Sequence, residues 1–171
     1  MNIILIGYRG TGKTAVGKKI AEALKKKFVE TDKLIVKKEG MDIPSIVKKN
    51  GWDFFRKLEK EVVGKVSEKD NMVISTGGGV ILDHENIENL KRNGKIIWLD
   101  AKPETIEYRM TNSNNKDRPP LKGKDAIEEI KEVLEERKEK YNKAADLTIN
   151  TDNKTINEVA KEIISLINPS G

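Results

Sequence analysis

The residues best suited to chemistry stand near the start of the chain, in the stretch GYRGTGKT that begins at Gly7. It follows an apolar run and contains three glycines, a lysine and two threonines. In the phosphate-binding pattern G-x-x-x-x-G-K-[ST], backbone N–H groups surround phosphate oxygens, the lysine reaches the β- and γ-phosphates, and the hydroxyl binds Mg²⁺. The chain matches this pattern at Gly7, Gly12, Lys13 and Thr14. We therefore predict a P-loop for a nucleoside triphosphate, with Thr14 as the metal ligand.

Two other classes of nucleotide-binding site have sequence patterns that resemble parts of this chain. Residues 10–15 also fit the dinucleotide fingerprint G-x-G-x-x-[GA], and the acids Glu30 and Asp32 lie about 20 residues further on. That fingerprint gives no role to the lysine and the threonine, and it occurs by chance far more often than the P-loop pattern. A GTP-dependent switch should carry a guanine motif N-K-x-D, and the run NNKD at 114–117 lacks the spacer residue. The P-loop is the favoured interpretation.

The amino-acid composition limits which class of protein this chain can belong to and which kind of metal site it can contain. Hydrophobic and charged residues each make up 36% of 171 residues, which is typical of one well-solvated domain, and no run approaches the length of a membrane helix. The chain starts with a strand pattern, which argues against a secretion signal. Without cysteine and with His84 as the single histidine, a metal must be held by oxygen ligands. The net charge of +5 comes without a basic stripe interleaved with aromatic residues, so we expect no nucleic-acid partner.

The spacing of apolar residues predicts an α/β fold. Continuous apolar runs predict strands buried on both faces at Asn2–Ile6, Phe28–Thr31, Met72–Ser75, Lys95–Leu99 and Leu147–Ile149. Helical spacing follows at Lys13–Lys26, Asp53–Ser67, Asp83–Lys91, Pro103–Met110, Asp125–Lys143 and Thr155–Ile167. Alternating strands and helices predict a parallel sheet covered on both faces, with ligands bound outside the carboxyl ends of its strands.

Unusual residues follow two further strands at that edge. Asp32 stands after the second strand, where it either caps the following helix or takes a proton from a substrate hydroxyl. Gly77, Gly78 and Gly79 follow the third strand. Three glycines exceed the needs of one turn and indicate that the backbone closely approaches a small ligand.

Two arginines in the predicted helices are expected to pair with an anionic group. Arg137 interrupts an apolar stripe at helical spacing, formed by Ile127, Ile130, Leu134 and Tyr141. An unpaired buried charge costs several kcal/mol, so its partner is either a protein carboxylate or a substrate anion. Arg56 precedes Glu59 by three residues, which favours an ion pair on a helix surface, worth about 0.2–0.5 kcal/mol.

The segment 111–124 is polar and contains two prolines and a glycine. It is either an ordinary surface loop, for which about 14 residues is long, or a lid, which its length favours. Closure of the lid would bring Arg118 onto the transferring phosphoryl group, and such arginines contribute roughly 10³–10⁵ in rate in related systems.

In order along the chain, GYRGTGKT, FVETD, FFRKLE, STGGG, RPPL and ERKEKYNKA resemble the shikimate kinase family, small P-loop kinases of the nucleoside-monophosphate-kinase type. The resemblance runs from about Asn2 to Ile167. It implies a three-layer α/β/α fold with a five-stranded parallel sheet in the order 2-3-1-4-5. It also implies a substrate-binding helical region near 33–60 and a mobile lid near 111–124, within one domain spanning 1–171.

The resemblance implies Mg²⁺- and ATP-dependent phosphorylation of the 3-hydroxyl of shikimate, giving shikimate 3-phosphate and ADP in the pathway to chorismate and aromatic amino acids. The catalytic residues it implies are Asp32, Lys13 and Arg118. The shikimate-binding residues it implies are Asp32, Arg56, Gly77, Gly78, Gly79 and Arg137. Two forked guanidinium groups suit one carboxylate.

The ATP-binding residues that the resemblance implies are Gly10, Thr11, Gly12, Lys13, Thr14, Ala15, Arg109 and Arg118. Arg109 would stack on the adenine, and Glu30 stands where an acid helps to hold the waters of the Mg²⁺ ion. A related kinase for another polyol acid, such as gluconate, would not need both Arg56 and Arg137. A nucleotide-binding switch would not transfer phosphate at all. We expect a shikimate-specific cytoplasmic enzyme that acts as a monomer, without a membrane partner.

Overall fold

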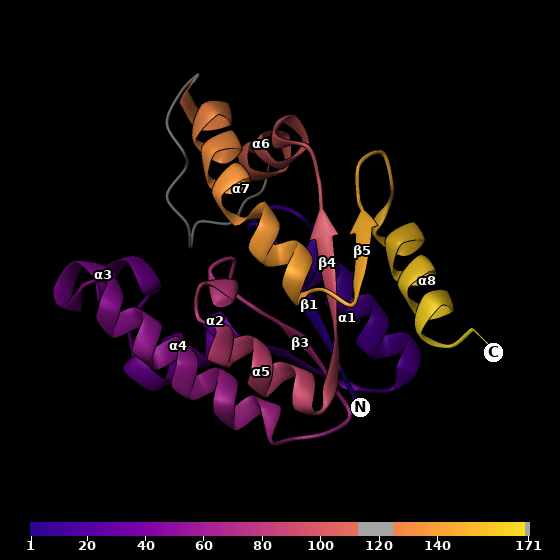
Figure 1. Ribbon diagram of the computed structural model, residues 1–171, viewed down its shortest axis with the longest axis horizontal. Coiled ribbons are helices and arrows are strands. Elements are labelled where there is room, and N and C mark those ends of the chain that lie inside the picture. Colours follow the sequence, from indigo (N-terminus) through magenta and orange to yellow (C-terminus); the bar gives the residue numbers. More distant parts are fainter. Residues whose placement is uncertain (113–124, 170–171) are drawn as a thin grey trace.

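The computed structural model describes residues 1–112 and 125–169, and its centre is a sheet of five parallel strands (Figure 1). The strands are β1 (Asn2–Ile6), β2 (Lys27–Glu30), β3 (Met72–Ser75), β4 (Gly94–Asp100) and β5 (Leu147–Asn150). They lie in the order β2-β3-β1-β4-β5, so the predicted fold and strand order are confirmed. Because β1 is central, the stretch that follows it starts in the middle of the carboxyl edge.

Eight α-helices and one 3₁₀ turn are present in the described residues. The helices are α1 (Lys13–Leu24), α2 (Thr31–Glu39), α3 (Ile43–Asn50), α4 (Trp52–Ser67), α5 (His84–Arg92), α6 (Pro103–Thr111), α7 (Asp125–Ala144) and α8 (Ile156–Ile167), and the turn η1 is Val80–Leu82. The predicted first helix ends two residues early because Lys25 adopts a left-handed conformation, with φ of 53°. The second predicted strand ends at Glu30 because Thr31 already begins α2.

The two faces of the sheet carry separate apolar cores. Alternate residues of β1 point to opposite faces, as in any strand. Ile3 and Leu5 pack with α1 and α8, whereas Ile4 and Ile6 pack with α4, α5 and the end of α7. All five residues of β1 are buried, which explains its uninterrupted apolar sequence.

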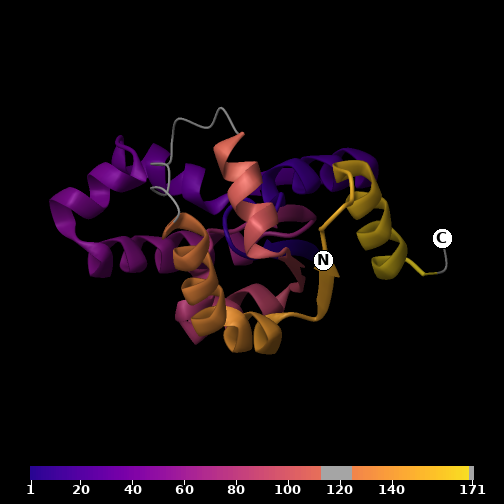
Figure 2. The same ribbon diagram turned by 90° about the horizontal axis from the view of Figure 1, so that it is seen from above.

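The remaining helices surround the carboxyl edge. In Figure 1, α6 and the first part of α7 lie beyond the arrowheads of β4 and β5, while α3 and α8 lie at opposite ends of the molecule, as Figure 2 also shows. The predicted substrate region 33–60 comprises most of α2, all of α3 and the first half of α4. Most of the predicted lid, 113–124, lies outside the described residues. None of the described helices is long and apolar enough to cross a membrane.

Candidate active site

The stretch GYRGTGKT forms a turn between β1 and α1 that requires glycine. Gly7, Gly10 and Gly12 have φ of 143°, 81° and 96°, values that residues with a side chain rarely adopt. Gly12 precedes α1 directly, and no side chain caps that helix. A helix N-terminus without a side-chain cap is the arrangement that binds phosphate in proteins.

Lys13 lies against this turn and is 7% exposed. Its ammonium nitrogen donates to the carbonyl oxygens of Gly7 at 2.6 Å and of Tyr8 at 3.0 Å. The Thr11 hydroxyl donates to the same Tyr8 oxygen at 2.8 Å. These bonds hold a positive charge inside the loop, where the predicted phosphates would bind.

Thr14 and Glu30 together provide oxygen ligands suited to Mg²⁺. The Thr14 hydroxyl donates to a Glu30 carboxylate oxygen at 2.5 Å, and Lys33 pairs with the other Glu30 oxygen at 3.1 Å. Within the described residues there is no cluster of three or more acidic, histidine or cysteine side chains that could hold a metal alone. Mg²⁺ usually keeps several waters and takes one or two protein ligands beside substrate phosphates. The pair of Thr14 and Glu30 fits that preference.

Asp32 lies in the first turn of α2, and Glu30 occupies the cap position. The interpretation of Asp32 as the helix cap is therefore wrong. A Cβ atom added to Gly77 would lie 2.8 Å from Asp32 Oδ1 and 3.2 Å from Glu59 Oε2. The absence of a side chain at Gly77 lets two carboxylates approach the loop backbone.

Arg56 reaches the same loop at its third glycine. A Cβ atom on Gly79 would overlap the Arg56 guanidinium. This guanidinium donates to Glu59 at 2.8 Å and lies 5.4 Å from the ring centre of Trp52. The predicted ion pair between Arg56 and Glu59 is therefore present. Glu59 is only 1% exposed, so the prediction that the pair lies on the helix surface is wrong.

Arg137 approaches the middle glycine from α7. A Cβ atom on Gly78 would lie 3.7 Å from Arg137 Nη1, 3.6 Å from the Gly7 oxygen and 3.7 Å from the Arg9 nitrogen. Gly78 therefore lies close to both the P-loop and a guanidinium. A Cβ atom on Gly77 or Gly79 would collide with a neighbouring functional group, whereas a Cβ atom on Gly78 would make only ordinary van der Waals contacts.

Glu59 is the buried acid of this cluster. Burial raises its pKa above the ordinary value of 4.5, the Arg56 charge opposes that shift, and the neighbouring Asp32 charge adds to it. One Glu59 oxygen bonds to Arg56, and the other is buried without a hydrogen-bond partner among the described residues. The carboxylate thus orients Arg56 at the expense of its own solvation.

This shift predicts a pH-dependent effect of Glu59→Gln on stability. A raised pKa means that folded protein binds more protons than unfolded protein, so wild-type stability falls as pH rises from the ordinary value through the folded pKa. Glutamine does not titrate. We expect the melting temperature of the variant to rise relative to that of the wild type as the pH increases above 4.5 in thermal scans.

The control for this experiment is Glu61→Gln. Hydrogen bonds from Lys38 and Lys65 lower the pKa of Glu61, so wild type should gain on that variant as pH rises. A constant difference between wild type and Glu59→Gln across the range would contradict the assigned shift.

Arg109 links α6 to the P-loop. Its guanidinium donates to the Thr151 hydroxyl at 2.9 Å, to the Thr151 carbonyl at 2.8 Å and to the Gly10 carbonyl at 3.4 Å. Burial lowers the pKa of Arg109, and nearby Asp152 opposes that shift. The structure places Arg109 beside the P-loop, whereas Arg118 lies outside the described residues.

Three residues of this site were not proposed as binding or catalytic groups from the sequence. They are Glu59, Tyr141 and Thr151, which contact Arg56, Gly78 and Arg109 respectively. Glu59 and Tyr141 follow Arg56 and Arg137 at helical spacing, which was the available signal. Thr151 follows β5, whose apolar run is short, so the sequence around it gave little indication of a functional residue.

Comparison with known proteins gives a consistent result. The model of the shikimate kinase family matches residues 9–168. The chain is 50% identical over 163 residues to the shikimate kinase of Caldanaerobacter subterraneus subsp. tengcongensis, covering 95% of this chain and 94% of that protein. It is 42% identical to the shikimate kinase of a Sulfurihydrogenibium species, covering 97% of each. The structure of the Acinetobacter baumannii shikimate kinase in complex with shikimate superposes with a TM-score of 0.90 at 34% identity, covering 97% of this chain and 92% of that one.

Proposed function

Because this chain belongs to the shikimate kinase family, we propose that the site at the carboxyl ends of β1, β2 and β3 transfers the γ-phosphoryl group of ATP to the 3-hydroxyl of shikimate. The products are shikimate 3-phosphate and ADP, on the route to chorismate and aromatic amino acids. The observation that carries the proposal is the loop formed by Gly77, Gly78 and Gly79, called the GGG loop below, where a carboxylate, two guanidinium groups and the P-loop meet.

The P-loop binds the triphosphate of ATP. The backbone of Gly10, Thr11, Gly12, Thr14 and Ala15 surrounds the phosphates, and the positive end of α1 points at them. The Lys13 ammonium, which is held inside the loop by the Gly7 carbonyl, neutralises charge on the β- and γ-phosphates. Mg²⁺, held by Thr14, supplies further neutralisation of the transferring group when it is bound.

The GGG loop receives shikimate. Arg56 and Arg137 bind the substrate carboxylate through forked hydrogen bonds, a geometry that lysine cannot reproduce. Asp32 lies at the opposite end of the loop from Arg56, which suits a substrate with an acid at one end and a hydroxyl at the other. Asp32 orients the attacking hydroxyl and accepts its proton.

Two further arginines complete the nucleotide site. Arg109 packs on the adenine, a role supported by its bonds to Thr151 and to the P-loop residue Gly10. Arg118 closes onto the phosphates and stabilises the transition state, as arginines do in related phosphoryl transfers.

We infer that the enzyme acts as a monomer. The P-loop, Asp32, Arg56 and Arg137 all come from a single chain, which supports a monomer. The charges of both signs are mixed along the sequence, which supports an enzyme without nucleic-acid or membrane partners. We place the enzyme in the cytoplasm, where ATP is made and used.

A coupled assay of ADP release tests the function. We expect release that depends on shikimate, with little turnover on gluconate. Equal or faster release with gluconate would identify a kinase for another polyol acid. Release that is the same with and without either acid would identify a nucleotide hydrolase or switch.

Removal of Arg137 should weaken shikimate binding specifically. We expect Arg137→Ala to raise the KM for shikimate about 10- to 100-fold, because a charge-assisted hydrogen bond is worth about 1.5–3 kcal/mol, and to change the KM for ATP little. Arg137→Lys should recover only part of the loss because lysine keeps the charge without the fork. Steady-state kinetics in both substrates measure the split.

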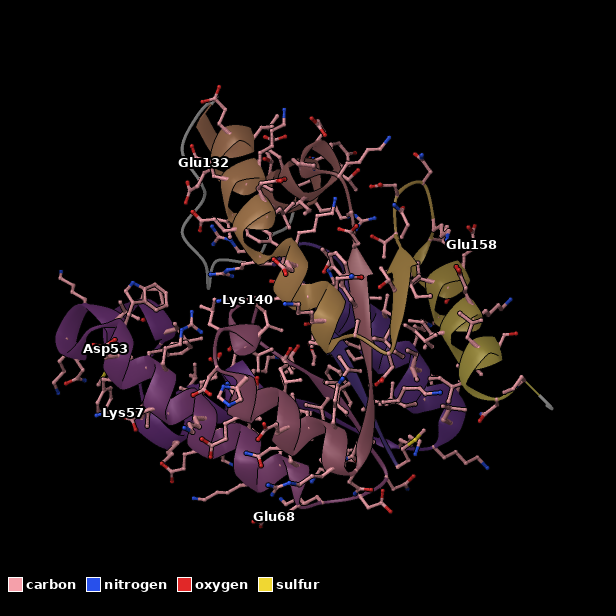
Figure 3. All side chains as sticks on the ribbon, in the orientation of Figure 1. Asp53, Lys57, Glu68, Glu132, Lys140 and Glu158 are labelled. Carbon is pink, nitrogen blue, oxygen red and sulfur yellow. The ribbon has the colours of Figure 1, made fainter. Side chains whose placement is uncertain are left out.

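Lys140→Ala is the matched control for this variant. Lys140 is exposed on the same helix and is labelled in Figure 3. A lowered melting temperature with an unchanged shikimate KM in Arg137→Ala would assign the arginine a structural role instead.

A further inference from the structure

Tyr141 is a fully buried residue whose hydroxyl reaches the GGG loop. It lies on α7, one helical turn after Arg137, and is 0% exposed. Its ring stacks on Trp98 of β4, with centroids 5.5 Å apart and planes 19° apart. A buried tyrosine hydroxyl requires a hydrogen-bond partner. It finds one in the Gly78 carbonyl oxygen, at 2.5 Å.

Gly78 is the loop residue that adjoins both halves of the site. A Cβ atom on Gly78 would contact both the P-loop oxygen of Gly7, at 3.6 Å, and Arg137 Nη1, at 3.7 Å. The carbonyl of Gly78 belongs to the same planar peptide unit as the N–H of Gly79, so a bond to that carbonyl also fixes the direction of that N–H. Glycine offers no side chain to resist rotation of its peptides, and an outside group must supply the restraint.

The hydroxyl is suited to this task at physiological pH. Burial raises the pKa of Tyr141, while the positive charge of Arg137 opposes the shift. The raised pKa keeps the hydroxyl protonated, so it remains a donor to Gly78 throughout the working range. The ring itself is held by the core and cannot follow a displaced loop, because Trp98 is also buried.

We propose that Tyr141 is a positioning residue for shikimate: its hydroxyl holds the Gly78 carbonyl and so sets the arrangement of the GGG loop relative to Arg137. This inference rests on the proposed function. Tyr141 touches neither substrate in this role. It acts through the loop that receives the ring hydroxyls and through the spacing between that loop and the guanidinium that binds the carboxylate.

Tyr141→Phe tests the inference because it removes only the hydroxyl and keeps the ring on Trp98. We expect the KM for shikimate to rise about 3- to 10-fold, the range that follows from losing one buried hydrogen bond. The KM for ATP should stay within about twofold, because the P-loop keeps its own internal bonds. A purely structural tyrosine would lower the melting temperature and leave both KM values unchanged, which would overturn the inference.

A double-mutant cycle with Arg137→Ala tests whether the effect of Tyr141 depends on the guanidinium, to which the Tyr141 hydroxyl is also hydrogen-bonded. If Tyr141 acts by setting the loop against Arg137, its removal should matter less once the guanidinium is absent, so the two effects on shikimate KM should be clearly less than multiplicative. Fully multiplicative effects, or an equal rise in the KM for ATP, would contradict the proposal.

Tyr108→Phe is the matched control, since Tyr108 is an exposed tyrosine of α6 and should tolerate the same change. The inference and the proposed function fail in different ways. Absence of shikimate-dependent ADP release in the wild type would overturn the function. Normal wild-type turnover with an unaffected Tyr141→Phe variant would overturn the inference alone.

Discussion

Asp32→Asn should lower kcat by about 10²–10⁴, the range expected for loss of a general base, while the affinity for ATP stays within about twofold. Asparagine keeps the size and an acceptor oxygen but does not accept a proton from the hydroxyl. Asp32 adjoins Gly77 rather than the P-loop glycines, which is why nucleotide binding should survive. The coupled assay measures kcat, and calorimetric titration with ADP measures nucleotide affinity.

Asp53→Asn provides the control for that variant. Asp53 is exposed in the first turn of α4, and in Figure 3 it lies with Lys57 on the outer side of that helix. It should retain wild-type kcat. A near-normal kcat in Asp32→Asn would mean that the carboxylate is not the proton acceptor, even if the KM for shikimate rose.

The P-loop and the sheet could be predicted because their determinants are local. Positive φ at Gly7, Gly10 and Gly12 follows from a turn whose residues are consecutive in the sequence. A continuous apolar strand such as β1 reports burial on both faces without reference to the rest of the chain. Strand order is not local, and it came from the family resemblance.

The electrostatics of the substrate site could not be predicted from spacing. Three-residue spacing on a helix suggested a surface pair for Arg56 and Glu59, whereas the packing of α4 against the GGG loop buries the acid. Likewise, an arginine in an apolar stripe was equally compatible with a protein or a substrate anion. In the structure Glu59 pairs with Arg56, and Arg137 lies beside Gly78, where its charge also acts to lower the pKa of Glu59. Such assignments depend on contacts between segments far apart in the sequence.

The GGG loop combines a feature that local sequence predicts with features that only contacts between distant segments determine. Close backbone approach was predictable, because three glycines have no economical explanation as a turn. Which group approaches which glycine was not predictable, because Asp32, Arg56 and Arg137 arrive from three different helices. The Tyr141 hydroxyl belongs to this second category, since only the fold places it against Gly78.

Lys13→Met should lower kcat/KM for ATP by at least about 10²–10³, the loss seen when one preorganised donor to a transition-state oxyanion is removed. Methionine has a similar length but carries no charge, so the β- and γ-phosphates lose a neutralising partner. The same change also removes the bonds to the Gly7 and Tyr8 carbonyls, so part of the loss should appear as weaker ADP binding. Steady-state kinetics and ADP titration measure the two contributions.

Lys18→Met distinguishes phosphate contact from a general change in charge. Lys18 is exposed on the same helix, so its replacement removes one positive charge from α1 without touching the loop. Surface charges are screened over about 8–10 Å at physiological ionic strength, and Lys18→Met should therefore behave as wild type. Unaltered kcat/KM in Lys13→Met would contradict the phosphate assignment. A comparable loss in both variants would instead mean that the net charge of the helix, and not one ammonium held inside the loop, attracts the nucleotide.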